Sequence, residues 1–226
     1  MSHRYNTFMQ IHKGLRAMLY DTAIAIQQSD FRDENAAASI VKKVEKVIWL
    51  FEGHAHTEDS KVFPLLERYA PEVVADFERE HVKDHALGEA LLEALDMLKT
   101  APDAENRKTA STALRQAFDC FMAFNLEHMV KEETTINSLL WRYYTDADLL
   151  NLSRKIVQSI PIEMNMLYSH WIIAGINDEE LINWLEQACQ TAPPLVYDYL
   201  WDTACQLLDP QRWGNITQTI AYRMAA

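Results

Sequence analysis

Apolar residues recur at alternating three- and four-residue intervals through four long segments of the chain, and polar or proline-containing stretches separate these segments. This spacing keeps the apolar side chains on one face of an α-helix. The segments span about residues 5–28, 35–68, 71–99 and 107–143, and Pro64 is expected to bend or interrupt the second one near its end. Long helices with short connections predict an up-down-up-down four-helix bundle.

The remainder of the chain, from Thr145 onward, contains shorter segments that prolines separate. We expect four or five short helices there, as a C-terminal extension of the bundle. Four of the six tryptophans fall in this part. Large aromatic side chains on short helices indicate a compact region with its own core, or one packed on an end of the bundle. The predicted organisation is therefore a bundle over residues 1–144 and a short-helix region of unknown role over residues 145–226.

The amino-acid composition fits an all-α protein. The chain has 226 residues, 49% of them hydrophobic, which is enough for one large domain or for a domain with an appendage. It contains only five glycines, while alanine, leucine, glutamate and lysine are abundant. Sheets and their turns use more glycine, so this composition favours helices.

Charge and cysteine content restrict the partners and the location of the protein. The net charge of −12 argues against a nucleic acid and against an anionic membrane as the partner, because both are bound through clustered Lys and Arg. We find no long apolar run and no leader-like N-terminus, and we expect a cytoplasmic protein. Cys120, Cys189 and Cys205 lie far apart in apolar helical sequence and are expected to be buried, reduced thiols.

Metal-ligating side chains interrupt the apolar seam, meaning the line of apolar residues along the inward face of a helix. In the second segment the seam passes through Phe51 and continues into His54 and Glu58. Residues four apart lie about 40° from each other around a helix, whereas residues two apart lie about 200° apart. His54 and Glu58 therefore face inward together, while His56 and Asp59 are expected on the outside.

The other three seams are interrupted in the same way, at His12 in the first segment, at His81 and His85 in the third, and at His128 and Glu132 in the fourth. A single histidine on an apolar face is more often a hydrogen-bonded core residue than a ligand. Seven polar groups in one core are costly unless something satisfies them all, and a transition metal does so with imidazole and carboxylate ligands. A metal-free structural bundle is the remaining alternative.

The number of these ligands predicts two metal ions. Five imidazoles and two carboxylates are too many for a four-coordinate zinc site. If both carboxylates and one oxide, hydroxide or water bridge two six-coordinate ions, about one of about twelve coordination positions stays open for a diatomic ligand. Iron makes the most use of such a position, although manganese accepts the same ligands.

These motifs resemble those of the hemerythrin-like, or HHE cation-binding, family over about residues 5–143. The matching features are the early helical His12, HAHTE with His54 and Glu58, the VFPLLE that follows it, HVKDH with His81 and His85, and HMVKE with His128 and Glu132. The resemblance implies a four-helix bundle with a non-haem di-iron centre, oxo- or hydroxo-bridged. It also implies reversible O2 binding, O2 sensing, or the handling of NO, peroxide or iron–sulfur repair.

Glu133 is an alternative to Glu132 as the last metal ligand. Some hemerythrins use a carboxylate five residues after the last histidine, which is Glu133 here. Helix geometry places that residue about 140° from His128, so Glu132 is preferred.

Two classes of function stay open. The first is a di-iron protein that binds or senses O2 or a related diatomic such as NO, with a protein partner contacted through the C-terminal helices. The second is a di-iron oxidoreductase or stress-response protein that handles peroxide or NO, or an iron donor in iron–sulfur cluster repair. Tyr5 and Asn125 are the polar seam residues that could serve an enzyme, but no residue is assigned a catalytic role.

Overall fold

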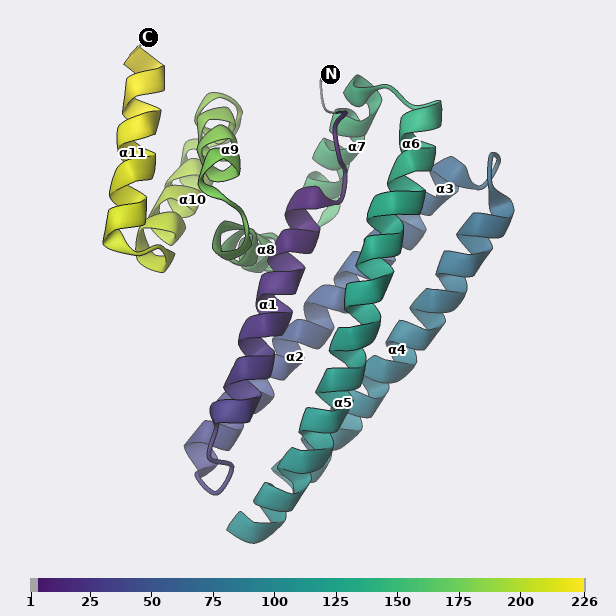
Figure 1. The fold of residues 1–226 in the computed structure, drawn as a ribbon, viewed down its shortest axis with the longest axis vertical. Helices are drawn as coiled ribbons and strands as arrows, with labels where there is room; N and C mark the ends of the chain where they lie inside the picture. The colour runs from purple at the N-terminus through teal and green to yellow at the C-terminus, as the bar shows by residue number, and fades with distance from the viewer. Residues whose placement is uncertain (1–3, 226) are drawn as a thin grey trace. The chain divides into compact units, whose positions relative to one another are not determined.

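The computed structural model describes residues 4–225, and these residues form helices joined by short connections, with no strand among them. The predicted all-helical class is confirmed. The long helices are α1 (Met9–Gln28), α2 (Glu34–Thr57), α4 (Pro71–Lys99) and α5 (Ala104–Lys131) (Figure 1). α4 packs along α5, and α2 packs along α4, so these three helices form a bundle.

Helix starts follow local sequence signals. The side chain of Asp33 accepts a hydrogen bond from the backbone N–H of Asn35 at the start of α2, and the side chain of Asp103 accepts one from Asn106 at the start of α5. α4 begins at Pro71, whose missing N–H costs nothing in a first helical turn.

Two of the predicted helices contain a π-helical turn, in which backbone hydrogen bonds span five residues. The segments are η1 (Glu58–Val62) followed by α3 (Phe63–Leu66), and η2 (Glu132–Ile136) followed by α6 (Asn137–Tyr143). The N–H of Phe63 donates to the carbonyl of Glu58, and the N–H of Asn137 donates to that of Glu132. Pro64 supplies no N–H to an α-helical ladder, which favours the wider turn in η1.

The chain divides into two compact units, Met1–Met9 with Met18–Ile160, and Gln10–Ala17 with Pro161–Ala226. The first unit includes α7 (Asp146–Ser159), whose Leu149 is fully buried in an apolar cluster. The buried members of this cluster are Phe8, Val62, Phe63, Leu66, Val74, Phe77, Ile136, Leu140 and Leu149.

The second unit consists of a stretch of α1 and four short helices. These are α8 (Ile162–Gly175), α9 (Asp178–Thr191), α10 (Pro194–Leu207) and α11 (Pro210–Ala225). With α7, five short helices lie between residues 146 and 225, within the predicted number. Trp184, Trp201 and Trp213 pack against a cluster of buried aliphatic residues here, so the region has a core of its own.

The three cysteines are free, but they are exposed, so the prediction that they are buried is wrong. Cys120 lies between Phe118 and Phe121, which are both buried. A residue next to a seam position is rotated about 100° away from it, so apolar sequence neighbours do not bury this thiol. Within residues 4–225, no helix has both the length and the apolar composition needed to cross a membrane.

Two glycines permit close packing inside the second unit. A Cβ at Gly175 would lie 2.4 Å from the backbone oxygen of Lys13, and one at Gly14 would lie 2.8 Å from the backbone nitrogen of Ile172. Gly175→Ala should lower the free energy of unfolding by about 1–3 kcal/mol, because backbone atoms cannot move aside as flexible side chains do.

Gly214→Ala is the matched control, since a Cβ there meets nothing within 4 Å. It should raise the free energy of unfolding by about 0.5–1 kcal/mol, the usual gain of Ala over Gly inside a helix. Chemical denaturation of both variants measures the difference, and equal effects would contradict the close contact at Gly175.

Candidate metal centre

Buried histidines and glutamates form two overlapping groups that could each hold a metal ion. The His12 group consists of His12, His54, Glu58 and Glu132, and the His81 group consists of Glu58, His81, His128 and Glu132. In each group, the ligand atoms lie within 4.8 Å of one another. Glu58 and Glu132 belong to both groups, as carboxylates that bridge two metal ions would.

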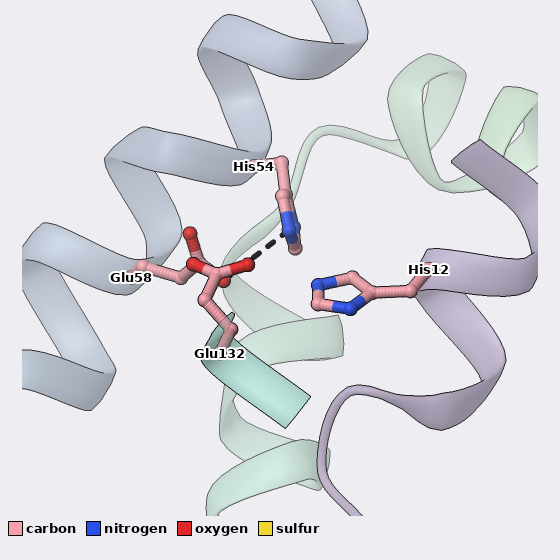
Figure 2. A group of neighbouring side chains, drawn as sticks. All are labelled: His12, His54, Glu58 and Glu132. Carbon is pink, nitrogen blue, oxygen red and sulfur yellow. Dashed lines mark ion pairs between the residues drawn. The ribbon is translucent and has the colours of Figure 1, made fainter. Parts of the chain in front are cut away.

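The side chains of the His12 group point toward one another. Figure 2 shows His12 directed from α1 toward His54 and toward the carboxylates of Glu58 and Glu132. The Nε2 atom of His54 lies 3.2 Å from Oε1 of Glu58, one helical turn further along the chain. His54 and Glu58, four residues apart, thus both face inward, as their spacing predicted.

Both shared glutamates are the first residue of a π-helical turn, Glu58 of η1 and Glu132 of η2. α-Helical spacing up to each glutamate keeps it on the face of the histidine before it, and the wide turn then shifts the seam by one residue. In the fourth predicted helix the seam continues from the buried Ile136 to the buried Leu140, four residues later, while Leu139 is half-buried. Such turns occur frequently at functional sites, and the apolar pattern alone did not reveal them.

The donor atoms of the His81 group converge. Nε2 of His81 lies 3.4 Å from Oε2 of Glu58, and Nε2 of His128 lies 3.1 Å from Oε1 of Glu132. The two Nε2 atoms are 3.2 Å apart. In the part of the chain that the structure describes, the buried oxygens of Glu58 accept no hydrogen bond. A buried carboxylate that faces imidazole nitrogens without hydrogen bonds fits a cation between them.

The protonation equilibria of the group reflect burial and close charges. Burial and the neighbouring charge of Glu132 raise the pKa of Glu58 well above its usual value. Burial disfavours protonated His128, but the hydrogen bonds and charges of Glu132 and Glu80 outweigh it and raise the pKa of His128 to about 9. Without metal, the site therefore holds protons that a cation would displace.

Phenylalanine rings fix the imidazoles of the His81 group. Phe63 stacks on His81 with ring centroids 5.3 Å apart, and Phe124 stacks on His128 at 5.8 Å. These contacts restrict ring rotation and keep water away from the donor nitrogens.

His85 lies outside both groups, although the sequence pattern predicted it as a ligand. Its side chain is 67% exposed, whereas Asp84 is buried. The buried seam of α4 alternates strictly, from His81 to Asp84, Gly88, Leu91 and Leu95. A step of four residues turns about 40° further than a whole turn, so two such steps in succession, as needed to reach His85, leave the inward face.

The neighbouring carboxylates and histidines differ in burial. Glu132 is buried and belongs to both groups, while Glu133 is half-buried and belongs to neither. His56 is exposed, as expected. Asp59 was expected to lie outside, and its side chain is 46% exposed, yet its Oδ1 atom is 2.7 Å from Nδ1 of His81.

The placement of His81 and His85 makes a testable contrast. His85→Ala should leave the metal content unchanged and change the free energy of unfolding by less than about 0.5 kcal/mol, since exposed substitutions rarely do more. His81→Ala should lower the metal content per chain. Metal analysis after dialysis, with denaturation as the stability measurement, checks both, and metal loss in His85→Ala would contradict the placement.

A small cavity of about 10 Å³ adjoins the groups. Its lining residues are Phe51, His54, Ala55, Glu58, His81, Asp84, Asn125 and His128. This volume accommodates about one water-sized molecule. The cavity therefore has room for a small ligand beside the candidate metal positions.

Two curated plant proteins are similar in sequence to this chain. The zinc finger protein BRUTUS-like At1g74770 of Arabidopsis thaliana is 23% identical over 181 residues, which cover 77% of this chain and 14% of that protein. The zinc finger protein BRUTUS-like At1g18910 of the same plant is 20% identical over 176 residues, with 76% and 14% covered. The chain thus matches a small part of these relatives. No solved structure matches significantly.

A family model described as the hemerythrin HHE cation binding domain matches residues 3–140, well over half of the chain. The matched range contains every residue of the His12 and His81 groups. The chain belongs to the hemerythrin family of HHE cation-binding domains.

Proposed function

We propose that this chain holds two iron ions and binds or senses O2 or a related diatomic such as NO. His12 and His54 would hold one ion and His81 and His128 the other, while Glu58 and Glu132 would bridge both. Bound iron would supply electrons and an open coordination position for the diatomic. A pair of cations is supported by the two buried carboxylates that the groups share and by the four imidazoles around them.

The main support for this proposal is the small cavity beside the candidate metal-binding side chains. His54 from the His12 group and His81 and His128 from the His81 group all contribute to its wall, with the shared Glu58. At about 10 Å³ it is too small for an organic substrate but large enough for a molecule the size of water. Phe51 on the same wall contacts Phe121 edge to face at 5.2 Å, which limits the entry of water.

A second candidate, a di-iron oxidoreductase acting on peroxide or NO, is favoured by two polar residues on the same wall. Nδ2 of Asn125 donates to Oδ1 of Asp84 at 2.6 Å and to the carbonyl of Phe121 at 3.1 Å. Burial raises the pKa of Asp84, so this carboxyl group holds its proton more tightly than an exposed one. Such a pair could hydrogen-bond a reacting oxygen species, whereas simple O2 storage does not need it.

Spectroscopy of the reduced, iron-loaded protein tests the proposal. We expect a charge-transfer band on exposure to air that disappears when O2 is removed. Catalytic turnover of peroxide or NO, slowed by Asp84→Asn, would favour the oxidoreductase. Iron-loaded protein that shows no O2-, NO- or peroxide-dependent change would contradict both functions.

Two further expectations remain predictions. The first is the up-down-up-down order of the four long helices, with a metal-binding domain over residues 1–144 and a short-helix region over residues 145–226. The second is that the C-terminal helices contact a protein partner.

A further inference from the structure

Two carboxylates that belong to neither metal group contact the Nδ1 atoms of the two imidazoles of the His81 group. Nδ1 of His81 lies 2.7 Å from Oδ1 of Asp59. Nδ1 of His128 lies 2.7 Å from Oε2 of Glu80. In both rings, Nδ1 therefore contacts a carboxylate outside the group, and Nε2 faces the other ligand atoms of the group.

Each carboxylate is the chain neighbour of a group residue and acts on a histidine of another helix. Asp59 follows Glu58 in η1 and reaches His81 on α4, and Glu80 precedes His81 on α4 and reaches His128 on α5. The contacts therefore connect η1, α4 and α5, which carry Glu58, His81 and His128 of the group.

These contacts select the ligand atoms of the two histidines. A neutral imidazole, the form that binds a metal, keeps its lone pair on Nε2 when it donates its Nδ1–H to a carboxylate. The Nε2 atoms are the ones that face Glu58, Glu132 and each other. A carboxylate behind a metal-bound imidazole fixes the ring and strengthens its electron donation to the metal.

Glu80 is held in place by a cation. Nζ of Lys131 lies 2.9 Å from Oε1 of Glu80, the oxygen that does not contact His128. Lys131 also lies 3.0 Å from Oε1 of Glu127, whose side chain is exposed.

We propose that Asp59 and Glu80 are positioning residues for the metal ion of the His81 group. They orient Nε2 of His81 and His128 toward the ion, and their negative charge stabilises its oxidised form. This inference rests on the proposed function, because it requires a metal ion in the group. Neither residue touches the small-ligand cavity, so neither is a catalytic residue.

Metal affinity is the first test. Glu80→Gln and Asp59→Asn keep the side-chain shape and remove the charge, and each should weaken ferrous-iron binding at one of the two positions by about 10–100-fold. Glu127→Gln is the matched control for Glu80, because it also removes a carboxylate from Lys131 but leaves His128 untouched. Glu89→Gln is the control for Asp59, because Glu89 lies 3.9 Å from the exposed His85.

The reduction potential of the bound iron is the second test. Glu80→Gln should raise the potential, because a negative charge behind His128 is lost. Lys131→Met should lower it, because the positive charge that offsets Glu80 is lost. A purely structural role predicts shifts in the same direction, since both variants break the chain of contacts from Lys131 through Glu80 to His128.

The outcomes separate this inference from the proposed function. Wild-type protein that binds two irons, with Glu80→Gln and Asp59→Asn binding as tightly as their controls, would overturn the inference and leave the proposed function standing. Potential shifts of the same sign in Glu80→Gln and Lys131→Met would also overturn it. Wild-type protein that binds no iron would overturn both.

Discussion

Glu132→Gln should abolish the binding of both metal ions, with a loss of affinity greater than about 100-fold at each position, more than the loss of an outer carboxylate causes. Glu132 is fully buried and belongs to both the His12 and the His81 group. The amide keeps the size of the side chain but cannot bridge two cations as an anion. Anaerobic titration with ferrous iron, followed by metal analysis of the desalted protein, measures the loss.

The matched control is Glu133→Gln, which removes the same charge one residue later in η2. Glu133 belongs to neither group, so this variant should bind iron as the wild type does. His81→Gln should weaken one position only, because His81 belongs to a single group. Metal loss in Glu133→Gln with normal binding by Glu132→Gln would contradict the ligand assignment.

The metal-free protein should become less stable as pH rises from about 6.5 to 9. The pKa of His128 is raised to about 9 in the folded protein, so between its unfolded and folded values the folded state holds a proton that the unfolded state has released. This contribution to stability is complete below the unfolded pKa of about 6.5 and is lost as pH rises through the folded value. The expected slope from His128 is about 1.4 kcal/mol per pH unit.

Glu58 acts in the same direction, because burial and the charge of Glu132 raise its pKa as well. Its contribution is complete below its unfolded pKa and is lost as pH rises through its folded pKa. Glu58→Gln should therefore flatten part of the pH dependence. Urea denaturation of metal-free protein at several pH values measures these slopes.

Bound metal should remove this pH dependence. Cations bind deprotonated ligands, so above about pH 6.5 neither the iron-loaded nor the unfolded protein holds these protons, and the stability of iron-loaded protein should stay level over the same range. The same denaturation series, carried out anaerobically on loaded protein, provides the comparison. A flat profile in metal-free protein, or identical slopes with and without iron, would show that these groups do not form the predicted site.

Sequence patterning predicted the helices well because each long helix buries one continuous apolar face. The third predicted helix matches α4, from Pro71 to Lys99. The first begins at Met9 instead of about residue 5, because the side chain of Asn6 accepts hydrogen bonds from the backbone N–H groups of Phe8 and Met9. Such capping depends on local geometry that apolar spacing does not record.

The candidate site was predictable where it depended on one helix at a time. The histidine and glutamate pairs four residues apart share a face in any α-helix, so His54 with Glu58 and His128 with Glu132 followed from spacing. His85 was predicted as a ligand but lies outside both groups. Reaching it from Phe77 through His81 takes two consecutive four-residue steps, whereas the buried face of α4 continues from His81 to Asp84.

The contacts of Asp59 and Glu80 depend on which helices are neighbours in space. That information is absent from the periodicity of any single helix, so the sequence pattern left both residues out. A carboxylate next to a predicted ligand in the chain is nevertheless a signal to examine, because its side chain can reach a ligand on the adjacent helix.

We infer that the two groups hold a pair of metal ions that share Glu58 and Glu132. The most direct measurement is the iron content per chain together with the electron paramagnetic resonance spectrum of the oxidised protein. We expect two irons per chain and no signal from isolated ferric iron, because shared bridging ligands couple the spins of the two ions. One iron per chain with the full signal of an isolated ferric ion, or no bound iron, would contradict the claim.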